Sequence, residues 1–253
     1  MKTVLITGTT SGIGYELSKI YAKKKYHLIL VSRSREKLLK QKEELLTMDN
    51  KVDIISFDLG KDNAADKVYQ EVVKNHWHVD ILINNAGFNE AGFFMETSRH
   101  KEQEMIALHV QFTTDMMKIF LPSMKEVGYG KILNIGSTGS YIASPKDAVY
   151  AATKAYNLHL SKALHAELKG TGISITTLCP GSTRTEFAKK ANMNETLLFK
   201  IFVMSADKVA RIGYKALQKR KSIVIPGLYN KVLVLSSKIL PYSFIGWMTK
   251  KML

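Results

Sequence analysis

Tyr150 and Lys154 form a pair whose residue types and spacing could do acid–base chemistry. They lie four residues apart in AVYAATKAYNLHLSKAL, a stretch with a helical pattern, so both side chains project from one helix face. An ordinary tyrosine keeps its proton at neutral pH, with a pKa of about 10. A fixed ammonium group nearby favours the phenolate, which suits general acid–base catalysis. Because Tyr-x-x-x-Lys is common by chance, the pair needs support from other residues.

Ser137 provides that support, because it ends the apolar run KILNIG thirteen residues before Tyr150. A hydroxyl at that place could hydrogen-bond a carbonyl oxygen from the same side as the tyrosine. The three side chains together predict proton exchange with the oxygen of a carbonyl or an alcohol.

Gly8, Gly12 and Gly14 follow the first apolar run, in VLITGTTSGIGYEL. Glycines between a strand and a helix allow a tight turn and a close approach of the backbone to a ligand. The helix beyond offers free N–H groups and the positive end of its dipole to a pyrophosphate. A glycine trio is weak evidence by itself, but its place after the first strand of an alternating pattern predicts a dinucleotide site.

The end of the second apolar run, LILVSRSREKL, indicates which dinucleotide binds. An acid usually holds the ribose 2′-OH at this place, whereas a 2′-phosphate requires a cation. Here there is no acid, but Ser32, Arg33 and Arg35 are present. A guanidinium group matches a phosphate, so we expect NADP(H) with Arg33 as the main contact. The alternative is that Arg33 is a solvent-facing residue at a helix start.

The elements that must position these residues alternate along most of the chain. Short β-branched runs are separated by stretches whose apolar residues recur every three or four positions. This alternation predicts βαβ units in a single α/β domain, a doubly wound Rossmann-type parallel sheet of about seven strands with helices on both faces. The expected strands are residues 3–7, 27–32, 52–57, 79–84, 131–136, 173–178 and 222–226.

Composition limits the other function classes. The chain has 253 residues and a formal net charge of +15, and no basic run is longer than the KRK at 219–221. Because no nucleic-acid-binding motif accompanies the lysines, we expect no nucleic acid; an anionic cofactor, a membrane surface and a solvated basic face remain alternatives. The single cysteine, Cys179, and a short first apolar run predict a cytoplasmic protein. The histidines lack ligand spacing, so we expect no metal.

Two segments depart from the alternating pattern. Residues 182–204 are long and apolar and follow a strand, where we expect a substrate lid. Residues 228–253 form an apolar, lysine-bearing tail after a catalytic domain at 1–227. Its longest uncharged run, 239–249, has 11 residues, too few for the roughly 20 of a spanning helix. The tail could pack on the core, pair with another subunit or lie on a membrane.

The motifs together resemble the short-chain dehydrogenase/reductase family over about residues 1–225. They are T-G-x-x-x-G-x-G at 7–14, NNAG at 84–87, Ser137, Tyr150-x-x-x-Lys154 and PGSTRT at 180–185, in the family's order and spacing. The segments NNAGFNEAGFFMETS and CPGSTRTEFAKKA further resemble an NADP-preferring subgroup with bacterial ketoreductase-like, steroid and long-chain acyl reductase members. The resemblance implies an oxidoreductase, expected to be a homo-oligomer (dimer or tetramer).

The resemblance also implies a role for each matching residue. Tyr150 would exchange a proton with the substrate oxygen, Ser137 would orient that oxygen, and Lys154 would lower the tyrosine pKa and hold the nicotinamide ribose. The remaining implied cofactor contacts are Gly8, Ser11, Gly12, Ile13 and Gly14 at the pyrophosphate, Asp58 at the adenine, Asn85 beside the adenosine ribose, and Pro180, Gly181, Thr183 and Thr185 at the nicotinamide.

Aromatic and aliphatic residues near the motifs favour an apolar carbonyl or alcohol substrate. The expected pocket walls are Phe88, Phe93, Phe94, Met95, Tyr141, Ile142, Phe187, Met193, Leu197, Leu198, Phe199 and Phe202. The alternative to an active enzyme is a catalytically weak NADP(H)-binding regulatory protein.

His109 is the one departure from the family's catalytic set. It lies in MIALHVQFTTDMMKIFLPSM, a predicted helix ending near Pro122, at the position where the family usually has an asparagine. That asparagine bends the helix and holds a water that links the lysine to solvent. Histidine also donates and accepts hydrogen bonds, and we expect a neutral ring near Lys154. His109 therefore either substitutes in the proton relay, slows the enzyme or inactivates it.

Overall fold

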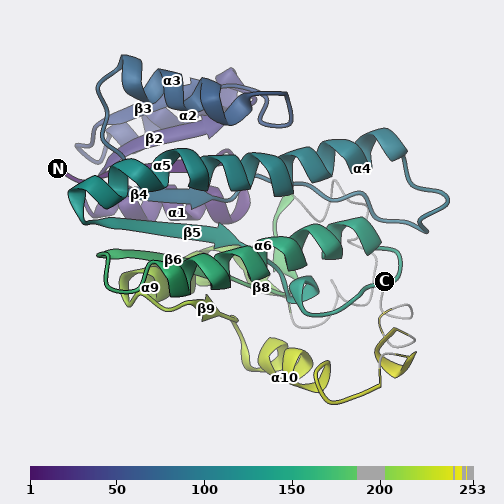
Figure 1. Cartoon of the computed structure of the whole chain (residues 1–253). Helices are drawn as coiled ribbons and strands as arrows, with labels where there is room; N and C mark the ends of the chain where they lie inside the picture. Colours follow the sequence, from purple (N-terminus) through teal and green to yellow (C-terminus); the bar gives the residue numbers. More distant parts are fainter. Residues whose placement is uncertain (187–202, 242, 247–248, 250–253) are drawn as a thin grey trace.

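The computed structural model describes residues 1–186, 203–241, 243–246 and 249. Its main sheet has seven parallel strands in the order β3-β2-β1-β4-β5-β6-β9. The predicted doubly wound parallel sheet is confirmed (Figure 1). The strands are β1 Thr3–Thr7, β2 His27–Ser32, β3 Val52–Ser56, β4 Ile81–Asn84, β5 Gly130–Ile135, β6 Ile173–Leu178 and β9 Ile223–Val224.

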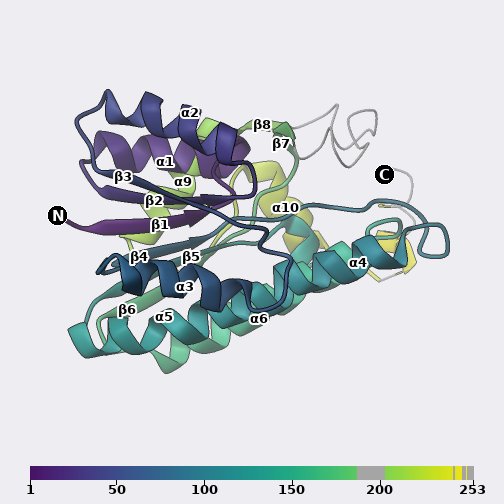
Figure 2. The ribbon, with the colours of Figure 1, turned by 90° about the horizontal axis from the view of Figure 1, so that it is seen from above.

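Helices cover both faces of this sheet, as Figure 2 shows. Buried strand residues alternate between two apolar cores, with Leu5 of β1 facing one and Val4 and Ile6 facing the other. One core lies under α3, α5 and α6, and the other under α1, α2 and α9. The helices are α1 Gly12–Lys23, α2 Arg35–Leu46, α3 Ala64–Lys74, α4 Arg99–Ile106, α5 Thr113–Val127, α6 Ala148–Glu167, α9 Ala206–Gln218 and α10 Leu228–Ser236.

Strand order reverses between β1 and β4, which are neighbours in the sheet although β2 and β3 separate them in the chain. The chains leaving β1 and β4 therefore diverge to opposite faces and leave a crevice at their carboxyl ends, which is where ligands bind in such sheets. A short second sheet, β7 Thr183–Arg184 with β8 Met204–Ser205, lies after β6 and had no signal in the sequence.

The long element between β4 and β5 is one continuous helical run with a π-helical segment, Ala107–Phe112, between α4 and α5. The predicted end near Pro122 is wrong, because α5 continues through Pro122 to Val127. Its end is set by Gly128, whose φ of 67° is left-handed and stops the helix.

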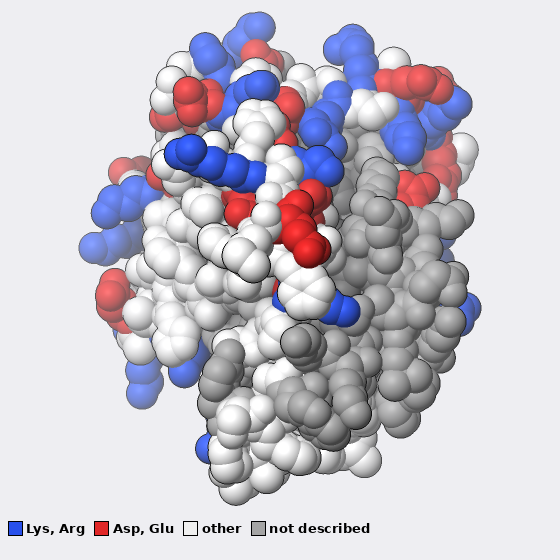
Figure 3. Space-filling model, turned by 90° about the vertical axis from the view of Figure 1, so that its right-hand side faces the viewer, with Lys and Arg blue, Asp and Glu red and all other residues white. Residues whose placement is uncertain are grey.

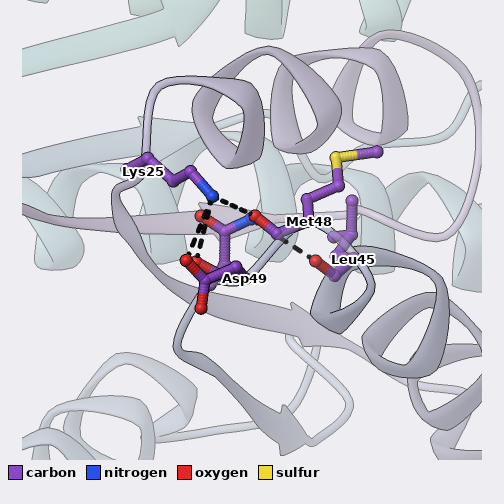
Figure 4. A network of polar contacts seen from close by, with 5 residues as sticks. Lys25, Leu45, Met48 and Asp49 are labelled. Atoms are coloured by element: carbon purple, nitrogen blue, oxygen red, sulfur yellow. Dashed lines mark hydrogen bonds and ion pairs between the residues drawn. The ribbon is translucent and has the colours of Figure 1, made fainter.

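The turn before β2 is tied to the turn before β3 by Lys25 (Figure 4). Its ammonium group donates to the Met48 carbonyl at 2.6 Å and lies 3.3 Å from the Asp49 carboxylate. Both charged side chains are exposed, so the ion pair adds little stability, and its effect is to fix the two turns relative to each other.

Candidate active site

A cavity of about 320 Å³ lies at the carboxyl ends of the parallel strands. Its walls come from the segments that follow β1, β2, β3, β4, β5 and β6 and from the start of α6. The sequence motifs are far apart in the chain, and the strand order brings them to this one cavity.

The glycine loop after β1 lines the cavity and packs closely against neighbouring segments. Gly8 has a left-handed φ of 68°, and a Cβ on it would lie 2.8 Å from the Ala86 backbone. A Cβ on Gly14 would clash with Asn85 and the Gly8 carbonyl, so this glycine serves close packing between the loop and α1 rather than lining the cavity. Gly12 has a φ of 60°, and with Ser11 and Ile13 it lines the cavity.

The N-terminus of α1 is open toward the cavity. The Ser11 side chain makes no capping hydrogen bond, and the first turn of α1 carries no acidic residue. Free N–H groups and the positive end of the helix dipole therefore face the cavity without a competing anion. This arrangement fits a pyrophosphate.

Asn85 braces the loop from β4. Its side-chain amide donates to the carbonyls of Thr7 at 2.9 Å and Gly8 at 2.8 Å, and the residue also lines the cavity. Both amide hydrogens of Asn85 are thus used to join the ends of β1 and β4. Only the other atoms of Asn85 could make the ribose contact that the resemblance implies.

The far end of the cavity, next to the ends of β2 and β3, carries cations. Arg33 is exposed there, and Lys61, which sequence reasoning missed, also lines the cavity. Thr10 was missed too; its hydroxyl lies 3.3 Å from that of Ser32. Asp58 lines the same end, with its carboxylate accepting from the Gly60 N–H at 3.2 Å. Two cations and several hydroxyls meet there.

Ser137, Tyr150 and Lys154 meet at the other end of the cavity, and all three line it. A side-chain hydrogen bond joins Ser137 to Tyr150. The Lys154 ammonium nitrogen lies 5.6 Å from the Tyr150 ring centroid and donates to the Ile135 carbonyl at 3.0 Å. The i,i+4 spacing on α6 and the end of β5 bring these side chains together.

The electrostatics of this group differ in part from expectation. Burial lowers the pKa of Lys154 to about 8. Burial raises the pKa of Tyr150 above its usual range, and the charge of Asp147 adds to that rise while the Ser137 hydrogen bond opposes it. In this structure the phenol therefore holds its proton firmly at neutral pH.

His109 is buried in the π-helical segment, with 1% of its surface exposed. Its Nε2 accepts from the Phe88 backbone N–H at 3.2 Å, so the ring proton is assigned to Nδ1, 3.0 Å from the Thr153 hydroxyl. That hydroxyl in turn donates to the Tyr150 carbonyl at 2.8 Å.

The His109 ring is held neutral. Burial, and then the charge of Lys154, keep its pKa well below the usual range. The ring packs edge-on against Tyr150, with 5.8 Å between ring centroids, and a Cβ on Gly87 would lie 2.7 Å from Nε2. The backbone carbonyl of His109 accepts from the Asn157 side chain at 2.8 Å. The side chain thus joins the NNAG loop to α6.

The loop after β6 forms another wall of the cavity and approaches the start of α1, where a Cβ on Gly12 would lie 2.9 Å from Thr185. Pro180, Gly181, Thr183 and Thr185 all line the cavity, and so does Ser182, which the motif had left out. Asn230 of α10 packs so closely on Gly181 that a Cβ there would clash with it. The start of the C-terminal tail therefore supports this loop.

The expected apolar walls are only partly present. Phe88 lines the cavity, whereas Phe93, Phe94 and Met95 are exposed, with Met95 95% exposed. Tyr141 and Ile142 do not line the described cavity; Ile142 is buried, and the Lys238 ammonium lies over the Tyr141 ring, 5.8 Å from its centroid. Phe187, Met193, Leu197, Leu198, Phe199 and Phe202 lie outside the described residues, as does most of the expected lid at 182–204.

Polar residues take the place of some of these walls. Asn89, Glu104 and Asp147 line the cavity, and sequence reasoning had not singled them out. A signal was available, since Asp147 lies only three residues before Tyr150.

Cys179 is buried and free, and burial raises the pKa of its thiol to about 12. Within the described ranges there is no group of three or more His, Cys, Asp or Glu side chains that could hold a metal ion. In the same part of the chain, no helix combines the length and apolar character needed to cross a membrane.

The sequence model of the short chain dehydrogenase family matches residues 2–196. The chain belongs to this family, and it is an oxidoreductase that uses a nicotinamide cofactor. Such a dinucleotide fits the cavity described above, with its glycine loop and the open N-terminus of α1.

Individual relatives agree with this assignment. The chain is 32% identical to an uncharacterized oxidoreductase of Thermotoga maritima, over 90% of this chain and 89% of that protein. It is also 32% identical to ketoacyl reductase HetN of Nostoc, over 71% of this chain and 63% of HetN, so it spans less than two thirds of that relative. A solved short-chain dehydrogenase from Sphingobium yanoikuyae in complex with NADPH superposes with a TM-score of 0.82 at 29% identity, covering 90% of this chain and 89% of that one.

Proposed function

We propose that the protein interconverts a carbonyl and an alcohol with NADP(H), using Tyr150 as the acid or base. The observation that carries the proposal is the meeting of Ser137, Tyr150 and Lys154 at one end of the cavity whose other end is the glycine loop. Ser137 orients the substrate oxygen and Lys154 supplies positive charge beside Tyr150. A ketoacyl reductase among the relatives supports a carbonyl as substrate.

The proton chemistry follows from the two pKa values. Because the raised pKa of Tyr150 keeps the phenol protonated, the tyrosine is ready to donate to a carbonyl oxygen. Lys154, with a pKa of about 8, can return a proton to the phenolate at working pH. When NADP(H) is bound, it would supply the hydride chemistry at the reacting carbon, while Tyr150 and Lys154 handle the proton. Because Tyr150 starts protonated and Lys154 can reprotonate it, these proton transfers favour reduction near neutral pH.

The preference for NADP(H) is supported by the cations at the β2 end of the cavity. Arg33 and Lys61 line it, and the described end of β2 carries no acid that would repel a 2′-phosphate. Arg33 is exposed, so it can reach a phosphate at the mouth of the cavity.

His109 serves, in this proposal, as a working substitute for the usual asparagine. Its neutral ring braces the NNAG loop against α6, and its backbone carbonyl keeps a second lone pair beyond the bond from Asn157. The relay of protons from Lys154 then depends on the position of this carbonyl, which the π-helical segment sets, and not on the imidazole nitrogens.

The test is a panel of ketones and aldehydes with NADPH oxidation as the readout. The wild type should reduce at least one carbonyl, and Tyr150→Phe should lower kcat by roughly 100-fold or more. Tyr156→Phe is the matched control, because Tyr156 lies on the same helix but its hydroxyl contacts Thr114, outside the cavity. NADPH binding without any turnover across the panel would favour the alternative, a catalytically weak NADP(H)-binding regulatory protein.

The substrate in this proposal has an apolar body. Phe88 and Leu108 line the cavity, and they favour burial of a hydrocarbon part. We place the reaction in the cytoplasm, since the free thiol of Cys179 fits a reducing compartment.

The tail at 228–253 is proposed to touch an anionic membrane surface. In α10 and just after it, Leu228, Val232, Leu235 and Ile239 share one exposed stripe at spacings of three and four, 54–78% exposed. Lys231 and Lys238 flank the stripe, and acids are absent from Leu228 to Leu240. Flotation with phosphatidylserine vesicles tests this: the wild type should float and Val232→Glu with Leu235→Glu should not. Equal flotation of both proteins would contradict it.

A second copy of the chain is the proposed partner of α4 and α6. Ile106, Val110, Val149 and Ala152 line a shallow apolar groove between these helices. A dimer or tetramer would bury it. Light scattering after gel filtration tests this, since Ala152→Glu should shift the wild-type oligomer to monomer, and a wild type that is already monomeric would contradict it.

A further inference from the structure

Asp147 places a buried carboxylate at the substrate end of the cavity. It is the residue before α6, a place where an aspartate commonly caps the helix, but its side chain makes no capping hydrogen bond. Its Oδ1 instead accepts from the Asn89 amide at 2.8 Å. Asp147 is 9% exposed and Asn89 6% exposed, and both line the cavity.

This carboxylate has no cation beside it among the described residues. Its neighbour Lys146 lies over the Phe93 ring, Lys101 pairs with Glu90, and Lys154 donates to the Ile135 carbonyl. Asn89 donates to Oδ1, and no described residue donates to Oδ2. A buried carboxylate with so little compensation is costly, and burial raises the pKa of Asp147 to about 6.

The carboxylate also lies near the reacting group. Asp147 is three residues before Tyr150, both line the same cavity, and the charge of Asp147 raises the pKa of the phenol. A ligand group that meets Asp147 would therefore be close to the carbonyl carbon that the Tyr150 proposal places in the site. Figure 3 shows the face of the molecule at the carboxyl ends of the strands, where acidic side chains near the middle lie beside lysines and arginines.

We infer that Asp147, held by Asn89, is a subsite for a hydrogen-bond donor of the substrate, an O–H or N–H group next to the reacting carbon. The donor completes the hydrogen bonding of the carboxylate, which the described residues leave open at Oδ2. The preferred substrate is thus an apolar ketone bearing a hydroxyl or ammonium group close to its carbonyl. This inference rests on the proposed carbonyl reduction and adds the group by which the site selects its substrate.

The test compares 2-hydroxyacetophenone with propiophenone, which differ by O–H against CH₃ beside the same carbonyl. The wild type should favour the hydroxyketone in kcat/KM by roughly 10- to 100-fold, as expected for a hydrogen bond to a charged group. Asp147→Leu should remove this preference, and Asp147→Asn, which keeps the shape and the bond from Asn89, should reduce it. Glu90→Gln is the matched control, since Glu90 pairs with Lys101 outside the cavity, and it should leave the preference unchanged.

Binding gives a readout that does not depend on turnover. Calorimetry with NADPH-loaded protein, in which an alcohol cannot be oxidised, should show 1-phenyl-1,2-ethanediol or 2-amino-1-phenylethanol binding more tightly than 1-phenylpropan-1-ol, and the first two ligands separate a hydroxyl from an ammonium partner. Reduction of both ketones with equal kcat/KM would overturn the subsite while leaving carbonyl reduction intact. Reduction of neither ketone would count against the proposed function, and failure of both donor ligands to bind more tightly would overturn the subsite.

Discussion

The buried ammonium of Lys154 makes the stability of the fold depend on pH in a way that can be measured. Lys154 is 5% exposed, and burial lowers its pKa from 10.5 to about 8. Between these two pH values the unfolded chain binds more protons at this residue than the folded chain does. Stability therefore rises with pH across the window from 8 to 10.5, and the full penalty is present below pH 8.

The magnitude follows from the two pKa values. A gap of about 2.5 pH units at about 1.4 kcal/mol each corresponds to roughly 3 kcal/mol. About 1 kcal/mol of this is recovered between pH 7 and 9, and roughly 2–3 kcal/mol by pH 10. For a chain of this length the first step corresponds to a Tm rise of about 2–4 °C relative to a protein without the lysine.

The assay is urea unfolding of cofactor-free protein at pH 7, 8, 9 and 10, with wild type compared with Lys154→Met. Between pH 7 and 9 the free energy of unfolding of the wild type should rise by about 1 kcal/mol relative to that of the variant, because other titrating groups cancel in the difference. For Lys162→Met, at an exposed position of α6, the free energy of unfolding should depend on pH in the same way as that of the wild type. Parallel curves for wild type and Lys154→Met would refute the reasoning and remove the basis for Lys154 as a proton donor near pH 8.

Three further predictions follow from the same site. Arg33→Ala should lower the preference for NADPH over NADH by roughly 10- to 100-fold in kcat/KM, and an unchanged ratio would contradict a phosphate contact. Gly87→Ala should lower the free energy of unfolding by about 1–3 kcal/mol, because its Cβ would lie 2.7 Å from the His109 ring; Gly60→Ala, whose Cβ meets nothing closer than 3.6 Å, is the control. His109→Asn should keep kcat within about tenfold while Tm falls, since the bond to the Phe88 N–H is lost. A large gain in turnover would show that the histidine impairs the relay.

The sequence could predict the fold because its signals are local and repeated. Each strand run is apolar and β-branched, and each helical stretch has a three-to-four periodicity, so the parallel doubly wound sheet followed. The glycine loop and the Tyr150–Lys154 pair were visible for the same reason, since a turn and an i,i+4 spacing are properties of neighbouring residues.

Tertiary structure alone decided the features that depend on burial and on contacts between distant segments. The spacing of Tyr150 and Lys154 predicts a lowered tyrosine pKa, but burial and the charge of Asp147 raise it. The end of helix α5 is a different case, because Gly128, which stops the helix, is a local signal that the interpretation of Pro122 overlooked.

His109 shows the division most directly. Its position in the chain marked it as the departure from the family's pattern, but the partners of its ring come from two distant segments, Phe88 in the loop after β4 and Thr153 in α6. A sequence determines which groups are present and how near neighbours are spaced. Which groups lose water and which distant partners they meet is decided only when the sheet brings its strand ends together, because desolvation and hydrogen bonding depend on the whole surrounding structure.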